Sequence, residues 1–162
     1  MDRLILFAAT LGPIGRKLPA PGTFGSLAGL LVFWLLIFPA NIEPLFVLSA
    51  FAILALCAIP LCGKAEILLS KEDPKEVILD EFVAQPLVFV GVPWSSYSYS
   101  FDTVLLWGLG FALFRFFDIM KPLGISRLQS IPGGAGVVVD DIAAAIPAGL
   151  AIWLLWENVI IS

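Results

Sequence analysis

Five apolar stretches constrain the fold of this chain more than any other feature of its sequence. They cover residues 24–39, 45–62, 77–94, 103–120 and 137–156. A helix needs roughly 20 apolar residues to cross the hydrocarbon core of a bilayer, and these stretches approach that length. Backbone groups in lipid must be hydrogen-bonded within their own segment, which favours helices. The sequence therefore predicts an all-α, polytopic membrane protein with about five transmembrane helices.

The composition supports a membrane environment. Of the 162 residues, 60% are hydrophobic and only 14% are charged, whereas soluble domains are about 45–50% apolar and 25% charged. The chain has no basic tail or basic domain, so nucleic acid is not an expected partner. Cys57 and Cys62 lie in an apolar run and are interpreted as small core residues, not as a disulfide or a metal site.

The amino-terminal segment begins with a basic residue and a short apolar run, as a signal peptide does. However, Arg16 and Lys17 follow closely, and no small-x-small cleavage site separates them from the run. We therefore expect a short interfacial or re-entrant helix that remains part of the protein.

The basic residues indicate the orientation of the predicted spans. All nine fall in three regions of the chain. Arg3, Arg16 and Lys17 precede the first span, and Lys64, Lys71 and Lys75 lie between the second and third spans. Arg115, Lys121 and Arg127 lie between the end of the fourth span and the start of the fifth. The alternate loops, residues 41–44 and 95–102, and the carboxyl terminus have no Lys or Arg. By the positive-inside rule, the basic regions are predicted to be cytoplasmic.

Acidic residues cluster at the predicted cytoplasmic ends of three spans. They are Asp80 and Glu81 in the third, Asp118 in the fourth, and Asp140 and Asp141 in the fifth. Ionisable residues at the edge of hydrocarbon are costly and usually functional. Hard divalent cations such as Mg²⁺ prefer oxygen ligands. The pattern therefore predicts a magnesium site, with these five carboxylates as candidate ligands.

Structural interpretations of the same acids remain open at this stage. The helix dipole favours acids in a first turn, which would account for the four that open the third and fifth spans. Asp118 lies three residues from Arg115 and from Lys121, a spacing typical of ion pairs. Adjacent acids point about 100° apart on a helix, so Asp140 and Asp141 need not bind the same ion.

Two glycine-rich segments precede predicted helices. Residues 19–26 (PAPGTFGS) place the hydroxyls of Thr23 and Ser26 at a helix amino terminus, where backbone N–H groups can bind phosphate. A Pro/Gly turn with a Thr or Ser cap explains the same pattern. Residues 131–136 form the second segment, a weaker signal. The chain has no histidine, Cys-x5-Arg loop or Asp-x-Asp motif, which leaves a metal-centred mechanism as the simplest one.

Four blocks, in order, resemble those of the phosphatidylglycerophosphatase A family: residues 19–26 (PAPGTFGS), 80–85 (DEFVAQ), 114–122 (FRFFDIMKP) and 133–145 (GGAGVVVDDIAAA). The chain departs from the family pattern at four small or apolar positions and at no acid: Ala84, Gly124, Val138 and Ala145.

The resemblance implies a single integral-membrane phosphatase domain over residues 1–162. Its expected activity is magnesium-dependent hydrolysis of phosphatidylglycerophosphate to phosphatidylglycerol in phospholipid synthesis, in the cytoplasmic leaflet of the bacterial inner membrane. The implied catalytic set comprises the five acids, which would hold one or two Mg²⁺ ions, together with Lys121. The implied substrate-binding residues are Arg16, Lys17, Thr23, Ser26, Gln85 and Arg115. Whether the protein forms a homo-oligomer stays open.

Two other functions compete with this interpretation. A small transporter could bind a cation with its acids, although transporter sites usually lie at the bilayer midplane and not at its edge. A CDP-alcohol phosphotransferase is also a magnesium enzyme of the inner leaflet, but the chain lacks the Asp-Gly-x-x-Ala-Arg block of that family.

Overall fold

The computed structural model describes residues 1–93, 101–122 and 124–156, and all regular structure within these ranges is helical. The elements in chain order are α1 (Asp2–Ala9), α2 (Pro13–Lys17), α3 (Pro21–Ile37), α4 (Pro44–Leu69), α5 (Leu79–Ala84), η1 (Gln85–Phe89), α6 (Phe101–Met120), η3 (Ile125–Ser130) and α7 (Gly134–Leu155). The elements η1 and η3 are 3-10 helices. The predicted all-α class is confirmed.

Three of the described helices are long and apolar enough to cross a membrane. They are α4, the Thr103–Met120 part of α6, and α7, whereas α3 is apolar but has only 17 residues. The helix α4 has 26 residues and continues seven residues beyond the predicted end at Cys62. These lengths and compositions confirm the architecture of a polytopic helical membrane protein.

The third predicted span differs from its expected form. The sequence predicted one long helix over residues 77–94, but the structure has the six-residue α5 followed directly by the five-residue η1. Pro86 lies at the start of η1, where it lacks a backbone N–H and cannot support a regular α-helix. Residue 94 and most of the predicted loop at 95–102 lie outside the described residues.

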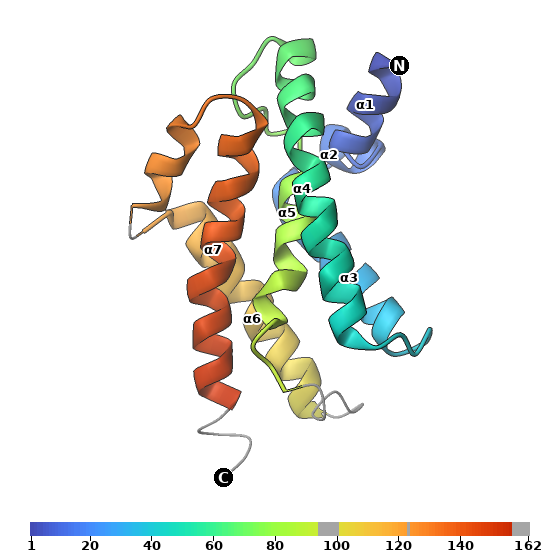
Figure 1. Cartoon of the computed structure of the whole chain (residues 1–162), viewed down its shortest axis with the longest axis vertical. Coiled ribbons are helices and arrows are strands. Elements are labelled where there is room, and N and C mark those ends of the chain that lie inside the picture. The colour runs from blue at the N-terminus through green and yellow to red at the C-terminus, as the bar shows by residue number, and fades with distance from the viewer. Residues whose placement is uncertain (94–100, 123, 157–162) are drawn as a thin grey trace.

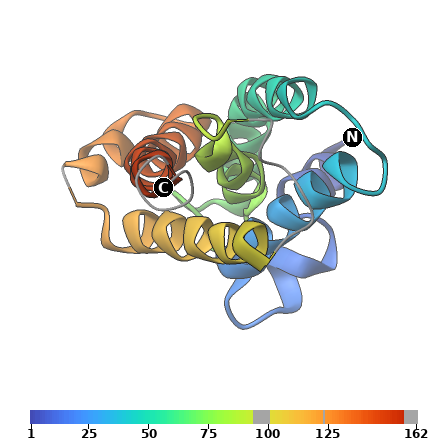
Figure 2. The same ribbon diagram turned by 90° about the horizontal axis from the view of Figure 1, so that it is seen from below.

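The short α5–η1 element occupies the middle of the molecule. Seen from below, it is surrounded by the four longer helices (Figure 2). It packs against α3, α4 and α7, and its η1 part also contacts α6. Glycine allows the closest approach: a Cβ at Gly29 of α3 would lie 2.2 Å from the carbonyl oxygen of Phe82 in α5. Small residues allow helix backbones to pack in this way in membrane proteins.

Aromatic side chains form the core beside η1. Phe33 of α3, Phe89 of η1 and Trp107 of α6 stack on one another, with ring centroids 5.2–5.9 Å apart. All three are buried. Such stacked pairs stabilise the fold beyond their burial alone.

The segments that carry the basic residues gather at one end of the molecule. The helices α1 and α2, the connection from α4 to α5, and η3 lie toward the same end, whereas the α3–α4 turn lies at the opposite end (Figure 1). Leu4 and Phe7 of α1 are 74% and 62% exposed, and Ala9 is buried. An interfacial or re-entrant position for this amino-terminal part stays a prediction.

Candidate functional site

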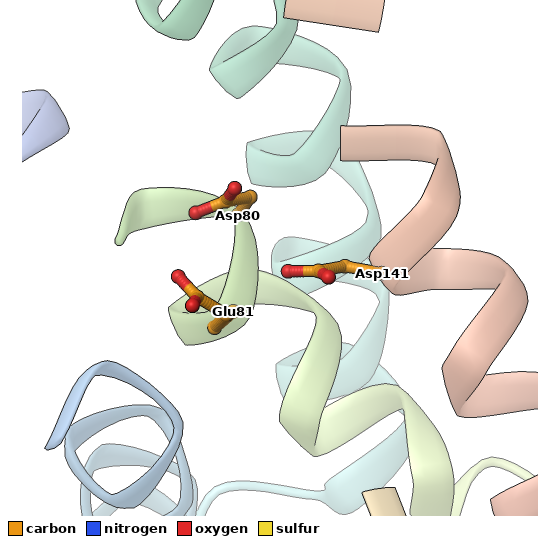
Figure 3. Close-up of side chains that lie close together, drawn as sticks. All are labelled: Asp80, Glu81 and Asp141. Carbon is orange, nitrogen blue, oxygen red and sulfur yellow. The ribbon is translucent and has the colours of Figure 1, made fainter. Parts of the chain in front are cut away.

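Three of the five predicted acids come together in the interior. Asp80 and Glu81 belong to the first turn of α5, and Asp141 lies on α7 (Figure 3). Each offers a carboxylate oxygen, and these oxygens lie within 4.8 Å of one another. Each residue also has one buried oxygen without a hydrogen-bond partner: Asp80 Oδ1, Glu81 Oε2 and Asp141 Oδ2. Carboxylates this close repel one another unless a cation offsets them, so this acid trio could hold a divalent metal ion.

The sequence left two interpretations of Asp140 and Asp141 open: metal ligands, or acids placed in a first turn by the helix dipole. The residue at which α7 begins tests the second interpretation. The sequence predicted that α7 begins at residue 137, but it begins at Gly134 and has no acid in its first turn. The two aspartates therefore lie in the second turn, where the helix dipole has little effect. The dipole interpretation of these two acids is wrong. It remains applicable only to Asp80 and Glu81, which do occupy the first turn of α5.

Arg115 of α6 links three helices around the acid trio. Its guanidinium pairs with Asp118, as the spacing predicted, and lies 3.8 Å from Glu81 Oε1. It also donates a hydrogen bond of 3.3 Å to Ser26 Oγ in α3. The Ser26 hydroxyl in turn donates to the carbonyl oxygen of Gly22 at 2.9 Å. Ser26 is fully buried, so it holds Arg115 in place from behind.

Lys121 makes a different ion pair from the one its spacing allowed. It follows the end of α6 with φ at +42°, a left-handed conformation that turns the chain away from the axis of α6. Its ammonium group pairs with Asp140, not with Asp118. Asp140 Oδ1 also accepts a hydrogen bond from the backbone N–H of Asp141 at 3.1 Å. Asp140 therefore connects Lys121 to the acid trio.

The ammonium group of Lys121 stays charged at neutral pH. Burial opposes its charged form, but the hydrogen bond to Asp140 and the charges of Asp140 and Asp141 raise the pKa of Lys121 above its usual value. Lys121 lies beyond the last residue of α6 and lines the same cavity as the acids.

A cavity of about 450 Å³ collects most of the predicted site residues. Those in its lining are Thr23, Asp80, Glu81, Arg115, Asp118, Lys121, Asp140 and Asp141. The first turn of α3 also lines the cavity through Pro21, Gly22 and Thr23. The first N–H groups of a helix have no acceptor within the helix, which suits this end to binding an anion. The acid cavity thus combines a carboxylate cluster, a helix amino terminus and three cations, Lys75, Arg115 and Lys121.

The remaining predicted substrate-binding residues are not part of this lining. Arg16 and Lys17 are exposed at the end of α2, and Ser26 lies behind Arg115. Gln85 is fully buried, and neither its amide nitrogen nor its amide oxygen has a hydrogen-bond partner among the described residues. Their roles stay predictions.

Sequence reasoning missed several residues of the acid cavity. Asp73 and Lys75 come from the connection between α4 and α5, and Gln129 comes from η3. Gln129 Nε2 donates to Asp73 Oδ2 at 2.9 Å across 56 residues of sequence. In the sequence, Asp73 and Lys75 belong to a run of charged residues typical of a solvated loop, so no local signal distinguishes them.

Gly22 has a role that the sequence did not reveal. A Cβ built at this position would lie 2.1 Å from Glu81 Oε1 and 3.3 Å from Arg115 Nη2. Only a residue without a side chain leaves room for the Glu81 carboxylate where it lies. The glycine therefore sets how closely α3 approaches the acid trio.

Comparison with known proteins gives consistent matches. Residues 7–156 match the family described as Phosphatidylglycerophosphatase A. A protein of that name from Haemophilus influenzae is 34% identical over 138 residues, which cover 85% of this chain and 79% of the relative. Another of that name from Escherichia coli is 28% identical over 142 residues, 86% of this chain and 73% of the relative.

A third relative carries a different name. A protein from Bacteroides thetaiotaomicron, named as a putative phosphatidylinositol-3-phosphatase, is 39% identical over 75 residues. That match covers 46% of this chain and 44% of the relative. No solved structure gives a significant match.

Proposed function

Because the chain belongs to the phosphatidylglycerophosphatase A family, we propose that it hydrolyses the terminal phosphate ester of phosphatidylglycerophosphate. The products are phosphatidylglycerol and inorganic phosphate. One observation supports this activity most strongly: the acid trio shares a cavity with Arg115, Lys121 and the amino terminus of α3. These are the groups that binding a phosphate and an activating cation requires. The family membership gives no support to the transporter alternative.

The charges of the acid cavity support a metal requirement. Six carboxylates and three cations line it, and two of the cations, Arg115 and Lys121, pair with acids of the cavity. Without a further cation, this excess of negative charge would repel a phosphate dianion. We assign Asp80, Glu81 and Asp141 as the Mg²⁺ ligands, because their unpartnered buried oxygens fit a hard cation. Bound Mg²⁺ would offset charge on the phosphoryl oxygens and lower the pKa of a water molecule.

The other charged residues orient the substrate. Arg115 is positioned by Asp118 and Ser26, and Lys121 by Asp140. Both cations bind phosphoryl oxygens in this proposal, and arginine can do so with two parallel hydrogen bonds. The free N–H groups in the first turn of α3, at Gly22 and Thr23, complete the phosphate site.

The proposal places the acid cavity on the cytoplasmic side of the bacterial inner membrane. The segments with basic residues lie toward one end of the molecule, the end at which α5 and α7 begin (Figure 1). Basic segments are retained in the cytoplasm during membrane insertion. A phospholipid of the cytoplasmic leaflet would present its terminal phosphate at this depth.

Phosphate release by the purified protein tests the proposal. Mixed micelles of phosphatidylglycerophosphate, phosphatidic acid or phosphatidylinositol 3-phosphate are compared, each with EDTA and after Mg²⁺ is restored. We expect release from phosphatidylglycerophosphate to be fastest, to stop with EDTA and to return with Mg²⁺. Full activity in EDTA would refute the metal assignment, and faster release from another lipid would refute the substrate.

A further inference from the structure

The lining of the acid cavity differs in exposure between its interior and its rim. The acid trio is buried or partly buried, and so are the paired cations Arg115 and Lys121. The exposed lining residues form the rim: Pro19, Ala20, Asp73, Lys75, Ile119 and Gln129. A lipid whose terminal phosphate lies beside Arg115 and Lys121 must pass this rim on its way to the bilayer.

Lys75 is the basic residue of the rim, and it has no ion pair with any described residue. The ion pairs among those residues involve Lys71, Arg115 and Lys121. Glu76, which follows Lys75 in sequence, pairs with Lys71 at 3.3 Å. Asp73, the acid of the rim, accepts a hydrogen bond from Gln129. The Lys75 ammonium group is therefore available to a ligand at the opening of the cavity.

The backbone that carries Lys75 is held in place, although its side chain is exposed. Lys75 lies in a turn closed by a hydrogen bond of 2.8 Å from the Val77 N–H to the carbonyl oxygen of Pro74, and both of these residues are buried. The next residue packs on α2, because a Cβ at Gly15 would lie 2.1 Å from the carbonyl oxygen of Glu76. The fold thus fixes the point from which the Lys75 side chain reaches the rim, which lowers the cost of ordering it on a ligand.

The substrate proposed above carries two phosphate groups. Its terminal phosphate is a monoester, and a glycerol unit links this group to a phosphodiester that is joined to the diacylglycerol. When the monoester lies between Arg115 and Lys121 in the interior, the phosphodiester lies nearer the bilayer lipid, at the rim. The phosphodiester is an anion, and Lys75 is the cation on the rim that can bind it.

We propose that Lys75 binds the phosphodiester of the substrate and favours lipids that carry this group in addition to the terminal monoester. The inference rests on the function proposed above and adds a determinant of specificity to it. Lysine suits this role because its ammonium group acts as a point charge on a flexible stem and needs no two-oxygen geometry. Phosphatidic acid has no phosphodiester and would gain nothing from Lys75.

Product inhibition separates the two phosphate sites. Phosphatidylglycerol, the lipid product, keeps the phosphodiester and lacks the monoester, whereas inorganic phosphate resembles the monoester alone. Release of radiolabelled phosphate from phosphatidylglycerophosphate is measured in mixed micelles with either inhibitor present. Diacylglycerol, added in place of phosphatidylglycerol, corrects for dilution of the substrate in the micelle.

Lys75→Gln should raise KM for phosphatidylglycerophosphate about fivefold, the scale of an exposed ion pair. Its kcat should stay within about twofold of the wild-type value, because the monoester site is unchanged. The inhibition constant of phosphatidylglycerol should rise about as much as KM, whereas that of inorganic phosphate should stay within about twofold. Lys75→Arg keeps the charge and should restore both KM and the inhibition by phosphatidylglycerol.

Lys64→Gln is the matched control for the lost charge. Lys64 is also exposed and has no ion pair with a described residue, but it does not line the acid cavity. This variant should keep the wild-type KM and both inhibition constants. Equal melting temperatures confirm that the variants fold.

Other results would overturn the inference. Unchanged constants in Lys75→Gln would make Lys75 an ordinary solvated residue, and equal losses of inhibition by both products would place it at the monoester. The same rise in KM for Lys64→Gln would assign the effect to general attraction of an anionic micelle. A wild-type protein that releases no phosphate would refute the proposed function, and this inference with it.

Discussion

Gly22→Ala should lower the catalytic activity of the acid cavity while leaving the chain folded. The backbone of Gly22 lies within α3 and has no positive φ, so alanine is compatible with the conformation. The added Cβ, however, would lie 2.1 Å from Glu81 Oε1, and real Cβ atoms do not come closer than 3.0 Å to other heavy atoms. The Glu81 carboxylate must therefore move by about 1 Å, away from α3. Arg115 Nη2, at 3.3 Å from the same Cβ, restricts where it can go.

The size of the effect follows from that displacement. A shift of about 1 Å in a positioned group can lower the rate about 10²-fold. That factor corresponds to a loss of about 2.7 kcal/mol of transition-state stabilisation. We expect kcat/KM for phosphatidylglycerophosphate to fall by about this factor, with a higher Mg²⁺ concentration for half-maximal activity. Phosphate release over a Mg²⁺ titration measures both quantities.

Two further variants make the test specific. Gly108→Ala is the matched control, because a Cβ at Gly108 in α6 would meet nothing within 4 Å. It should keep full activity. Glu81→Asp shortens the side chain by one methylene, so in the double variant with Gly22→Ala the two losses should be less than additive. Full activity of Gly22→Ala at limiting Mg²⁺ would refute the role of Glu81 in the site, and additive losses would refute the steric explanation.

Three other predictions concern the charged residues. Asp141→Asn should lower kcat at least about 10²-fold and regain part of it at high Mg²⁺; near-normal kcat at limiting Mg²⁺ would exclude Asp141 as a ligand. Arg115→Ala should raise KM more than it lowers the folded yield, and a normal KM with reduced kcat would argue against direct phosphate binding. In a chain without its native cysteines, Lys71→Cys should react with an impermeant thiol reagent in inside-out vesicles, whereas labelling in intact cells would reverse the proposed orientation.

The sequence predicted the features that depend on hydrophobicity and on ionisable side chains placed next to hydrocarbon, where charge is energetically unfavourable. Apolar length predicted the all-α membrane class, and the placement of acids at the edges of apolar runs singled out five candidate ligands, of which the structure brings Asp80, Glu81 and Asp141 together. Each of these signals is local in the sequence. Ionisable side chains next to hydrocarbon are rare enough that their position alone is informative.

Features that depend on backbone direction or tertiary packing were not predictable. The third span is a short α-helix followed by a 3-10 helix. Whether Pro86 kinks a helix or ends it depends on the residues that pack around it, and the sequence does not show which residues these are. Lys121 pairs with Asp140 because its backbone adopts a positive φ, which residue spacing does not indicate. The contact of Gln129 with Asp73 and the space that Gly22 leaves for Glu81 arise only when distant segments meet.

The aromatic stack of Phe33, Phe89 and Trp107 also affects permeability. Phe33 and Trp107 lie ten and eleven residues from Thr23 and Asp118, the cavity-lining residues of their own helices, which is roughly 15–16 Å at 1.5 Å per residue, and Phe89 lies eight residues beyond Glu81. The proposed hydrolysis would bring water and a charged ester into the acid cavity, among the helices of a membrane. The closely packed apolar rings would then separate that cavity from the opposite side of the bilayer.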